Sequence, residues 1–267
     1  MTTFNLLLIA LIQGLTEFLP VSSSGHLILL PSLTGLADQG QIIDVAAHLG
    51  TLAAVVLYFS SDVRLALVGT LRLLRGKIDT KGAFLALCLL IATIPVIIVG
   101  LILKLTGLSE AMRGITVIGW AMIIFGVLLY WADQTGATEK TTERWSLKDA
   151  FKMGLWQAVA LIPGTSRSGI TITAGRMLGY TRTDAARLAM LMSIPTIIAS
   201  GALLSLDVIG TADASVLRDI GIVVAMSFVA ALCALTLMMR LLKSVSFTPY
   251  VIYRIGLGVI LLWIAYT

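Results

Sequence analysis

Long apolar runs separated by short polar stretches dominate the pattern of this chain. With their flanks, six of the runs reach the roughly 20 residues that a helix needs to cross a bilayer. They cover residues 45–61, 83–103, 114–132, 188–206, 220–239 and 248–266. Because apolar and polar residues do not alternate within them, the runs predict membrane helices rather than the strands of a β-barrel. We therefore predict an all-α polytopic membrane protein with six full transmembrane helices.

Two further apolar segments, residues 4–33 and 153–178, are interrupted near their middle by polar side chains and proline. Neither side of Pro20 in the first segment holds the ~20 residues of a full crossing. Irregular backbone at membrane depth is tolerated only where protein or a water-filled cavity surrounds it. We predict that each segment is a re-entrant helical hairpin, with the first turn at residues 20–25.

The two halves of the chain have the same order of elements, a broken segment followed by three spans. Since three is an odd number, the second half must lie upside down relative to the first, as in the inverted-topology repeats of many secondary transporters. The repeats cover about residues 1–132 and 149–267 of a single integral membrane domain, and a cytoplasmic loop at 133–148 joins them. In the first half, residues 62–82 mix apolar and basic side chains and predict an amphipathic surface helix.

Composition agrees with this architecture, since 58% of the residues are hydrophobic and only 12% are charged. Fourteen of the 19 Lys and Arg residues fall in four loops, at 62–82, 133–152, 176–187 and 240–248. By the positive-inside rule these loops are cytoplasmic. Both termini then face outward, and the hairpins enter from opposite sides, so that their tips meet. The net charge of +5 reflects these loops, and we expect no nucleic-acid partner.

The first broken segment carries candidate chemistry. Gln13 and Glu17 are four residues apart and share one helix face. Glu17 is suited to bind a metal ion, to act as a general base, or to pair with Arg167 or Arg254 as a structural carboxylate. Ionisable groups at membrane depth are costly and indicate a functional site.

A serine-rich turn follows, with Ser22, Ser23 and Ser24 ahead of His26. Such a turn at the start of a helix offers N–H groups and hydroxyls to an anion, while ordinary N-capping accounts for one of the serines. His26 is suited to general acid–base chemistry or to nucleophilic attack on phosphorus. His48 is interpreted as a histidine satisfied within the core.

The second broken segment contains the sequence PGTSRSGIT at residues 163–171. Arg167 provides a planar, permanently charged fork that suits phosphate oxygens. Its neighbours are glycines, which permit tight turns, and hydroxyl-bearing residues: Gly164, Thr165, Ser166, Ser168, Gly169 and Thr171. A pairing of Arg167 with Glu17 alone leaves the hydroxyl cluster unexplained, so we favour a phosphate-binding site.

Arg254 lies inside the last apolar run, after Tyr250 and Tyr253. Long basic side chains in membrane helices often extend to the interface and keep their charge in water. We favour this interpretation over the alternative, in which Arg254 is a second basic group lining the phosphate site.

Three segments carry a resemblance to a known family: QGLTEFLPVSSSGH at 13–26, PGTSRSGIT at 163–171 and SFTPYVIYR at 246–254. They resemble the undecaprenyl-diphosphatase family of bacitracin-resistance proteins, and length, span order and motif positions agree over the whole chain. The resemblance implies a multi-pass protein of the bacterial inner (plasma) membrane that removes the terminal phosphate from undecaprenyl diphosphate. It also implies a site open to the periplasmic or outer face, a divalent cation (Mg²⁺ or Ca²⁺), and recycling of the lipid carrier for cell-wall synthesis.

By this resemblance, four residues are catalytic: Glu17, Ser23, His26 and Arg167. The cation is assigned to Glu17 and to position 13, and the diphosphate to a larger group: Ser22, Ser24, Gly164, Thr165, Ser166, Ser168, Thr171 and Arg254. One departure is Gln13, because many family members have Glu there and an amide supplies no charge. Glu17 is therefore the main candidate ligand.

The expected mechanism has Arg167 and the hydroxyls hold the diphosphate while Ser23 attacks the terminal phosphorus and His26 carries the proton. A phosphohistidine at His26 and direct attack by water remain alternatives. A polyprenyl-phosphate transporter or flippase without phosphatase chemistry also suits an inverted repeat with central polar groups, and phosphate release separates the two functions. We expect the lipid substrate to enter sideways from the bilayer. The oligomeric state stays open, with a homodimer as one candidate.

Overall fold

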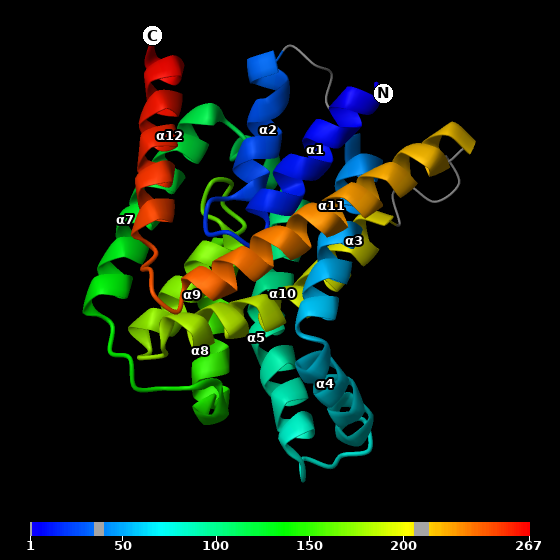
Figure 1. Ribbon diagram of the computed structural model, residues 1–267, viewed down its shortest axis with the longest axis vertical. Coiled ribbons are helices and arrows are strands. Elements are labelled where there is room, and N and C mark those ends of the chain that lie inside the picture. Colours follow the sequence, from blue (N-terminus) through cyan, green and yellow to red (C-terminus); the bar gives the residue numbers. More distant parts are fainter. Residues whose placement is uncertain (1, 35–39, 206–213) are drawn as a thin grey trace.

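The computed structural model describes residues 2–34, 40–205 and 214–267, and its regular secondary structure is helical apart from one isolated bridge between Lys140 and Tyr180. The elements are α1 (Thr3–Thr16), α2 (Ser23–Thr34), α3 (Gly40–Tyr58), α4 (Ser60–Leu73), α5 (Lys81–Thr106), α6 (Leu108–Ala111), α7 (Ile115–Thr135), η1 (Thr142–Arg144), α8 (Leu147–Val159), α9 (Arg167–Met177), α10 (Arg182–Ser205), α11 (Ala214–Leu241) and α12 (Thr248–Tyr266) (Figure 1).

Six of the described helices are long and apolar enough to cross a membrane: α3, α5, α7, α10, α11 and α12. They coincide with the six predicted spans, which are therefore confirmed in number and place. Residue 206, the predicted end of the fourth span, lies outside the described ranges. The surface helix predicted over residues 62–82 is present as α4 but ends at Leu73.

Local sequence sets where the helices begin and end. The side chain of Thr80 accepts a hydrogen bond from the N–H of Ala83 at 3.2 Å, and α5 begins at the next residue after Thr80. The same helix ends at Gly107, which has a φ of 69°. A threonine N-cap and a left-handed glycine at the C-terminus satisfy backbone groups that have no partner inside the helix.

Each of the two broken segments folds as a helix–turn–helix unit. A turn at residues 17–22 joins α1 and α2, and a turn at residues 160–166 joins α8 and α9. The first turn ends earlier than the predicted range of 20–25, because the hydroxyl of Ser22 accepts a hydrogen bond from the N–H of Gly25 at 3.3 Å. Ser22 thus caps α2, and the later part of the predicted turn belongs to that helix.

The short helices pack on spans from the opposite half of the chain. α1 lies along α11, and α8 lies along α5 (Figure 1). A Cβ atom at Gly14 of α1 would lie 2.6 Å from the Cβ of Ala230, and one at Gly154 of α8 would lie 2.6 Å from the carbonyl oxygen of Ala92. Small residues permit such close approach between membrane helices. This packing positions both turns at the centre of the molecule.

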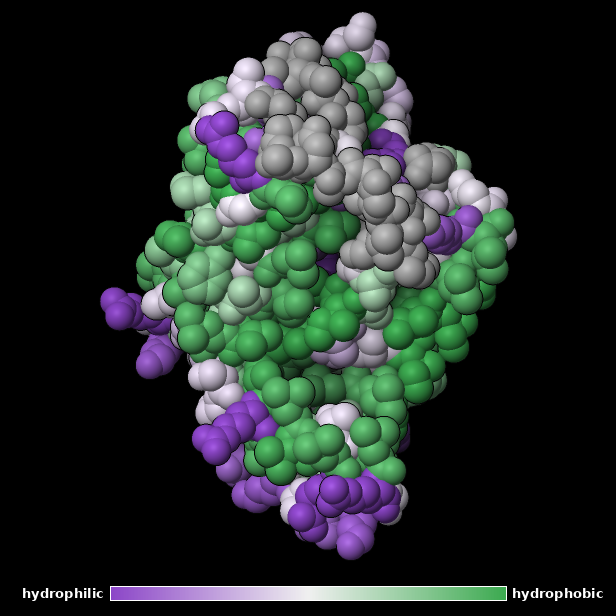
Figure 2. Space-filling model, turned by 90° about the vertical axis from the view of Figure 1, so that its right-hand side faces the viewer, coloured by the Kyte–Doolittle hydropathy of each residue, from purple (hydrophilic) through white to green (hydrophobic). Residues whose placement is uncertain are grey.

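The surface of the molecule divides into an apolar zone and a charged end. Figure 2 shows hydrophobic side chains across the middle of one face and hydrophilic ones gathered at its lower end, where Figure 1 places the turn between α4 and α5. On α12, Ile252 and Trp263 are each 67% exposed. Exposed apolar side chains of this kind suit contact with lipid.

Candidate functional site

The two turns share an unusual backbone conformation. Ser22 and Ser166, the residues before α2 and α9, have φ values of 73° and 70°, and within the described ranges no other non-glycine residue has a positive φ. Each hydroxyl accepts a hydrogen bond from a glycine N–H three residues on, Gly25 at 3.3 Å and Gly169 at 3.2 Å. Such backbone costs about 1–3 kcal/mol and clusters at functional sites.

Glu17, in the first turn, joins the two turns through its carboxylate. Its Oε2 accepts hydrogen bonds from Ser23 Oγ at 2.6 Å and from Gln13 Nε2 at 2.9 Å. Its Oε1 accepts one from Nη2 of Arg167, the first residue of α9. The side chains of Glu17 and Arg167 are only 6% and 16% exposed. The expected meeting of the two tips is thus present, and the partner of Glu17 is Arg167 rather than Arg254.

A pocket of about 200 Å³ opens beside this ion pair. Both turns line it together with α2, α3, α5, α8 and α10: Glu17, Ser22, Ser23, Ser24, His48, Val96, Gln157, Ala160, Leu161, Ser166, Arg167, Thr196, Ile197 and Ser200. At ~30 Å³ per water, the volume corresponds to roughly six or seven water molecules, which is room for a phosphate group and some solvent. Arg167 also donates from Nη1 to the carbonyl of Ser193 at 3.1 Å. A guanidinium has five N–H groups, so donors remain for a ligand.

His48, which the sequence analysis assigned to the core, lies in this pocket. Its Nε2 is 3.8 Å from Glu17 Oε2, and its side chain is 36% exposed. Its Nδ1 lies 2.8 Å from the carbonyl oxygen of Asp44, so Nδ1 carries the proton and Nε2 is free to face the pocket. The core interpretation was therefore wrong. Nothing next to His48 in the sequence signals this position, because it depends on how α3 packs against the first turn.

His26 lies outside the pocket wall. Its Nδ1 is 2.6 Å from the carbonyl oxygen of Ser22, and its Nε2 is 2.6 Å from the hydroxyl of Tyr253 on α12, with the two rings stacked. The hydroxyl of Ser23 donates to Glu17 instead. The geometry therefore does not support the expectation that His26 takes the proton of Ser23, and Glu17 occupies that position.

Arg254 is fully buried, with none of its surface exposed. Its Nη1 donates to the carbonyl of Pro20 at 3.4 Å, and its Nη2 donates to the carbonyls of Gly164 and Thr165 at 3.1 and 2.7 Å. The expectation that this side chain extends to the membrane interface is wrong. Buried carbonyl groups in turns need donors, and Arg254 supplies them to both turns at once.

The other predicted hydroxyls differ in their surroundings. Three serines line the pocket: Ser22, Ser24 and Ser166. Ser168 instead donates to the carbonyl of Leu19 in the first turn at 2.9 Å, so it ties the two turns together, and Thr171 donates to the carbonyl of Arg167 within α9 at 2.7 Å. Thr165 is buried, and its hydroxyl has no partner in the described chain. Gly164 has a φ of 90° and lies so close to Ile118 that a Cβ would be 2.6 Å from that residue's carbonyl oxygen.

The donors among the described residues do not form a divalent-cation site on their own. Among the described residues, no three His, Cys, Asp or Glu side chains group together as metal ligands. Both oxygens of Glu17 already accept hydrogen bonds, and Gln13 turns its amide nitrogen toward that carboxylate. Mg²⁺ and Ca²⁺ require at least six ligands, mostly oxygens. The residues present therefore do not fit an ion held by the protein alone.

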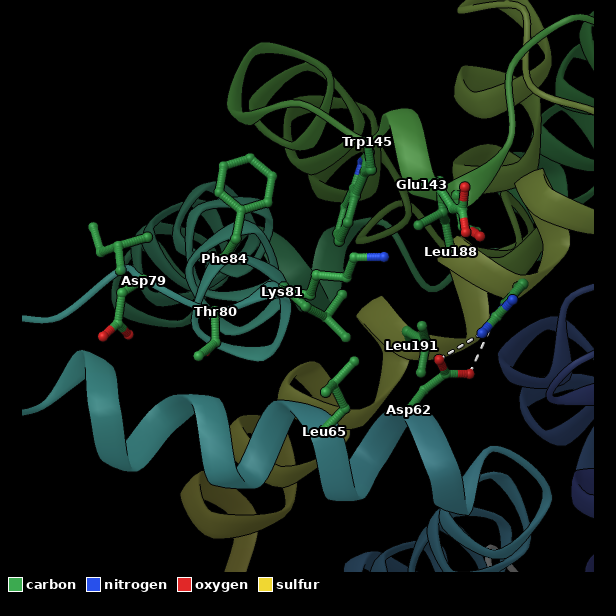
Figure 3. Close-up of a pocket in the computed structure, with 14 residues that line it drawn as sticks. Asp62, Leu65, Asp79, Thr80, Lys81, Phe84, Glu143, Trp145, Leu188 and Leu191 are labelled. Atoms are coloured by element: carbon green, nitrogen blue, oxygen red, sulfur yellow. Dashed lines mark hydrogen bonds and ion pairs between the residues drawn. The ribbon is translucent and has the colours of Figure 1, made fainter.

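A larger pocket of about 650 Å³ lies between α4, α5, η1 and α10 (Figure 3). In its wall Arg187 pairs with Asp62, with Nη2 and Oδ1 2.6 Å apart, and Asp79 pairs with Arg72 at the same distance. None of the residues of the two predicted motifs lines this pocket. The smaller pocket, where both motifs meet, is therefore the candidate active site.

Comparison with known proteins places the chain among related sequences. Residues 6–260 match the model of the family described as bacitracin resistance protein BacA. A protein from Roseobacter denitrificans named undecaprenyl-diphosphatase is 69% identical over 267 residues, which cover the whole of both chains. Proteins of the same name from Jannaschia sp. and Chromohalobacter salexigens are 69% and 42% identical, over 100% and 99% of this chain and 100% of each relative.

Proposed function

The chain belongs to the family of bacitracin resistance proteins BacA, and we propose that it hydrolyses undecaprenyl diphosphate to undecaprenyl phosphate and inorganic phosphate. Full-length relatives at 64–69% identity are named for this activity, so the chain is an undecaprenyl-diphosphatase, a membrane hydrolase acting on a lipid. One observation supports the choice of site. Glu17 accepts hydrogen bonds from Ser23 and from Arg167 of the second motif, beside a pocket large enough for phosphate.

Arg167 is the main electrostatic group of the proposed mechanism. Phosphoryl transfer passes through a loose transition state whose charge lies on the equatorial oxygens, so catalysis depends on positioning and charge stabilisation. The guanidinium is fixed by Glu17 on one side and by the Ser193 carbonyl on the other. This preorganisation lets its remaining N–H groups bind the terminal phosphate without rearrangement.

Ser23 is the proposed nucleophile. Its Oγ attacks the terminal phosphorus, the bond from that phosphorus to the bridging oxygen breaks, and undecaprenyl phosphate leaves. Ser23 then carries the phosphate until water cleaves the ester and releases inorganic phosphate. The proton passes from Ser23 to Glu17, which lies 2.6 Å away, and then to the departing lipid phosphate. A nucleophile and a base within hydrogen-bond reach, with the base oriented by a third group, is the usual arrangement for covalent catalysis; here Gln13 and Arg167 orient Glu17.

His26 and Arg254 have supporting roles in this proposal. Arg254 holds the backbone of both turns, and we do not assign it to the diphosphate. His26 hydrogen-bonds and stacks with Tyr253, so it links α2 to α12. Ser22, Ser24 and Ser166 offer hydroxyls to the diphosphate from the pocket wall.

A divalent cation, Mg²⁺ or Ca²⁺, remains a prediction from the family. The oxygens of the diphosphate would supply the ligands that the described residues do not provide, since Mg²⁺ is commonly bound through one or two carboxylates together with substrate phosphates. The cation would neutralise charge on the substrate.

We also propose the finer topology, with two re-entrant hairpins in an inverted repeat. In support, Gln13 precedes Ser22 by nine residues, as Gln157 precedes Ser166, and both serines have positive φ. The packing of α1 on α11 and of α8 on α5 has the same symmetry. With the basic loops in the cytoplasm, both termini and the opening of the site face outward. A homodimer stays a prediction.

Phosphate release tests the function. Purified protein in detergent is expected to release inorganic phosphate from undecaprenyl diphosphate, and Arg167→Ala is expected to lose that activity while it keeps its helical content. A folded wild-type protein that releases no phosphate would overturn the proposal. Lipid translocation in vesicles would then test the transporter alternative, which no contact in the described structure favours.

A further inference from the structure

Gln157 of α8 has a buried side-chain oxygen without a partner among the described residues. The residue is completely buried, and its Nε2 donates to the carbonyl oxygen of Ala92 at 3.3 Å. Its Oε1 has no hydrogen-bond partner in the described structure. Burial of an amide oxygen without a hydrogen bond is unfavourable, and such atoms commonly mark a site for water or a ligand. Gln157 lines the same pocket as Ser23, Glu17 and Arg167.

The chemistry of this oxygen limits what it binds. An amide oxygen only accepts hydrogen bonds, so its partner must bring an O–H or N–H group. A fully ionised phosphate has none, whereas water has two. A buried water needs two to four polar partners, and the hydroxyl of Thr196, which donates to the Met192 carbonyl at 3.0 Å, lines the same pocket and can still accept.

The equivalent amide in the other half of the chain does something different. Gln13, which occupies the matching place before Ser22, directs its Nε2 at Glu17 and does not line the pocket. Oε1 of Gln13 is likewise buried without a hydrogen-bond partner among the described residues, but of the two glutamines only Gln157 lines the pocket.

We propose that Gln157 holds the water that hydrolyses a phosphoserine at Ser23, a proposal that rests on the function given above. In this second step the oxygen of the water attacks phosphorus, and the bond between phosphorus and Ser23 Oγ breaks. Glu17 takes one proton from the water and returns it to Ser23 Oγ. The products are free Ser23 and inorganic phosphate. Gln157 accepts the other O–H of the water and so aims its lone pair at phosphorus.

Rapid-mixing kinetics test this assignment. Lipid phosphate and inorganic phosphate are measured separately after the protein is mixed with undecaprenyl diphosphate. Gln157→Met, which keeps the length of the side chain and removes the acceptor, is expected to give a burst of about one lipid phosphate per protein. Its inorganic phosphate is expected to appear on the order of 100-fold more slowly than in the wild type, because a misplaced reactant costs about that much. Mass spectrometry should then find a phosphate on Ser23.

Two further variants sharpen the result. Gln157→Asn keeps an amide, but its oxygen is drawn back by one methylene. It should give the same burst of lipid phosphate, with a smaller delay in the release of inorganic phosphate. This variant also keeps the test possible if Gln157→Met does not fold. Trp145→Phe is a matched control, because Trp145 Nε1 is also buried without a partner in the described ranges but lies away from this pocket. Both products should appear as in the wild type.

The outcomes separate this proposal from the function on which it rests. If both products slow equally in the two Gln157 variants and no phosphoserine accumulates, Gln157 does not serve the second step, while the hydrolase stands. If the wild type releases no phosphate at all, the proposed function fails and this assignment fails with it. A burst confined to the Gln157 variants supports both.

Discussion

The ion pair between Glu17 and Arg167 is expected to stabilise the fold as well as the transition state, and a double-mutant cycle separates the two contributions. Glu17→Gln leaves Arg167 charged and largely buried, with its side chain 16% exposed. Loss of one partner of a buried pair costs about 3–5 kcal/mol. Because Arg167 keeps some contact with the pocket and its bond to the Ser193 carbonyl, we expect the lower end, about 3 kcal/mol.

Arg167→Met removes the other charge and should cost a similar amount, since Glu17 then stays buried with only Ser23 and Gln13 as donors. The double variant Glu17→Gln/Arg167→Met should lose much less than the sum of the single variants, with a coupling of about 2 kcal/mol or more. Phosphate release should be lost in all three proteins. Chemical unfolding in detergent micelles gives the three free energies of unfolding. Strictly additive losses would show that the two side chains do not interact in the folded protein.

Three further predictions follow from other contacts of the structure. Ser23→Ala should lose phosphate release while its unfolding free energy stays within about 1.5 kcal/mol of the wild type, since one hydrogen bond is removed; residual turnover above one-tenth would argue for attack by water. Arg254→Met should cost about 3 kcal/mol of stability because three backbone carbonyls lose their donor. An unchanged free energy of unfolding would show that Arg254 does not stabilise the two turns. Burial and a 2.8 Å hydrogen bond to Asp149 raise the pKa of Tyr180, so the unfolded chain releases this proton first and stability should fall above about pH 10. Tyr180→Phe should make that fall shallower between pH 9 and 11.

Much of the architecture could be predicted from the sequence because hydropathy is a local property. A run of about 20 apolar residues can only be satisfied as a helix across lipid, so the six spans were found in the right places. The interruptions near Pro20 and Pro163 were visible for the same reason, since proline, glycine and ionisable groups cannot continue a lipid-facing helix, although the first turn was predicted three residues too late. The candidate residues Glu17, Ser23 and Arg167 stood out as polar groups in apolar surroundings.

The partners of those residues depended on tertiary packing. Glu17 had two arginines available in the sequence, and the approach of α1 to α11 and of α8 to α5 decided that Arg167 pairs with it and that Arg254 binds backbone carbonyls instead. His48 and Gln157 entered the pocket from α3 and α8, whereas His26 turned toward Tyr253.

The sequence by itself therefore determined the membrane helices, the two interruptions and the reactive residues within them. The length of an apolar run and the presence of polar groups inside it can both be read from neighbouring residues in the chain. Only the tertiary structure decided which polar atoms meet. Hydrogen bonds and ion pairs between Glu17 and a residue 150 positions away depend on distances of a few tenths of an ångström, and those distances are set by side-chain packing between helices rather than by any pattern along the sequence.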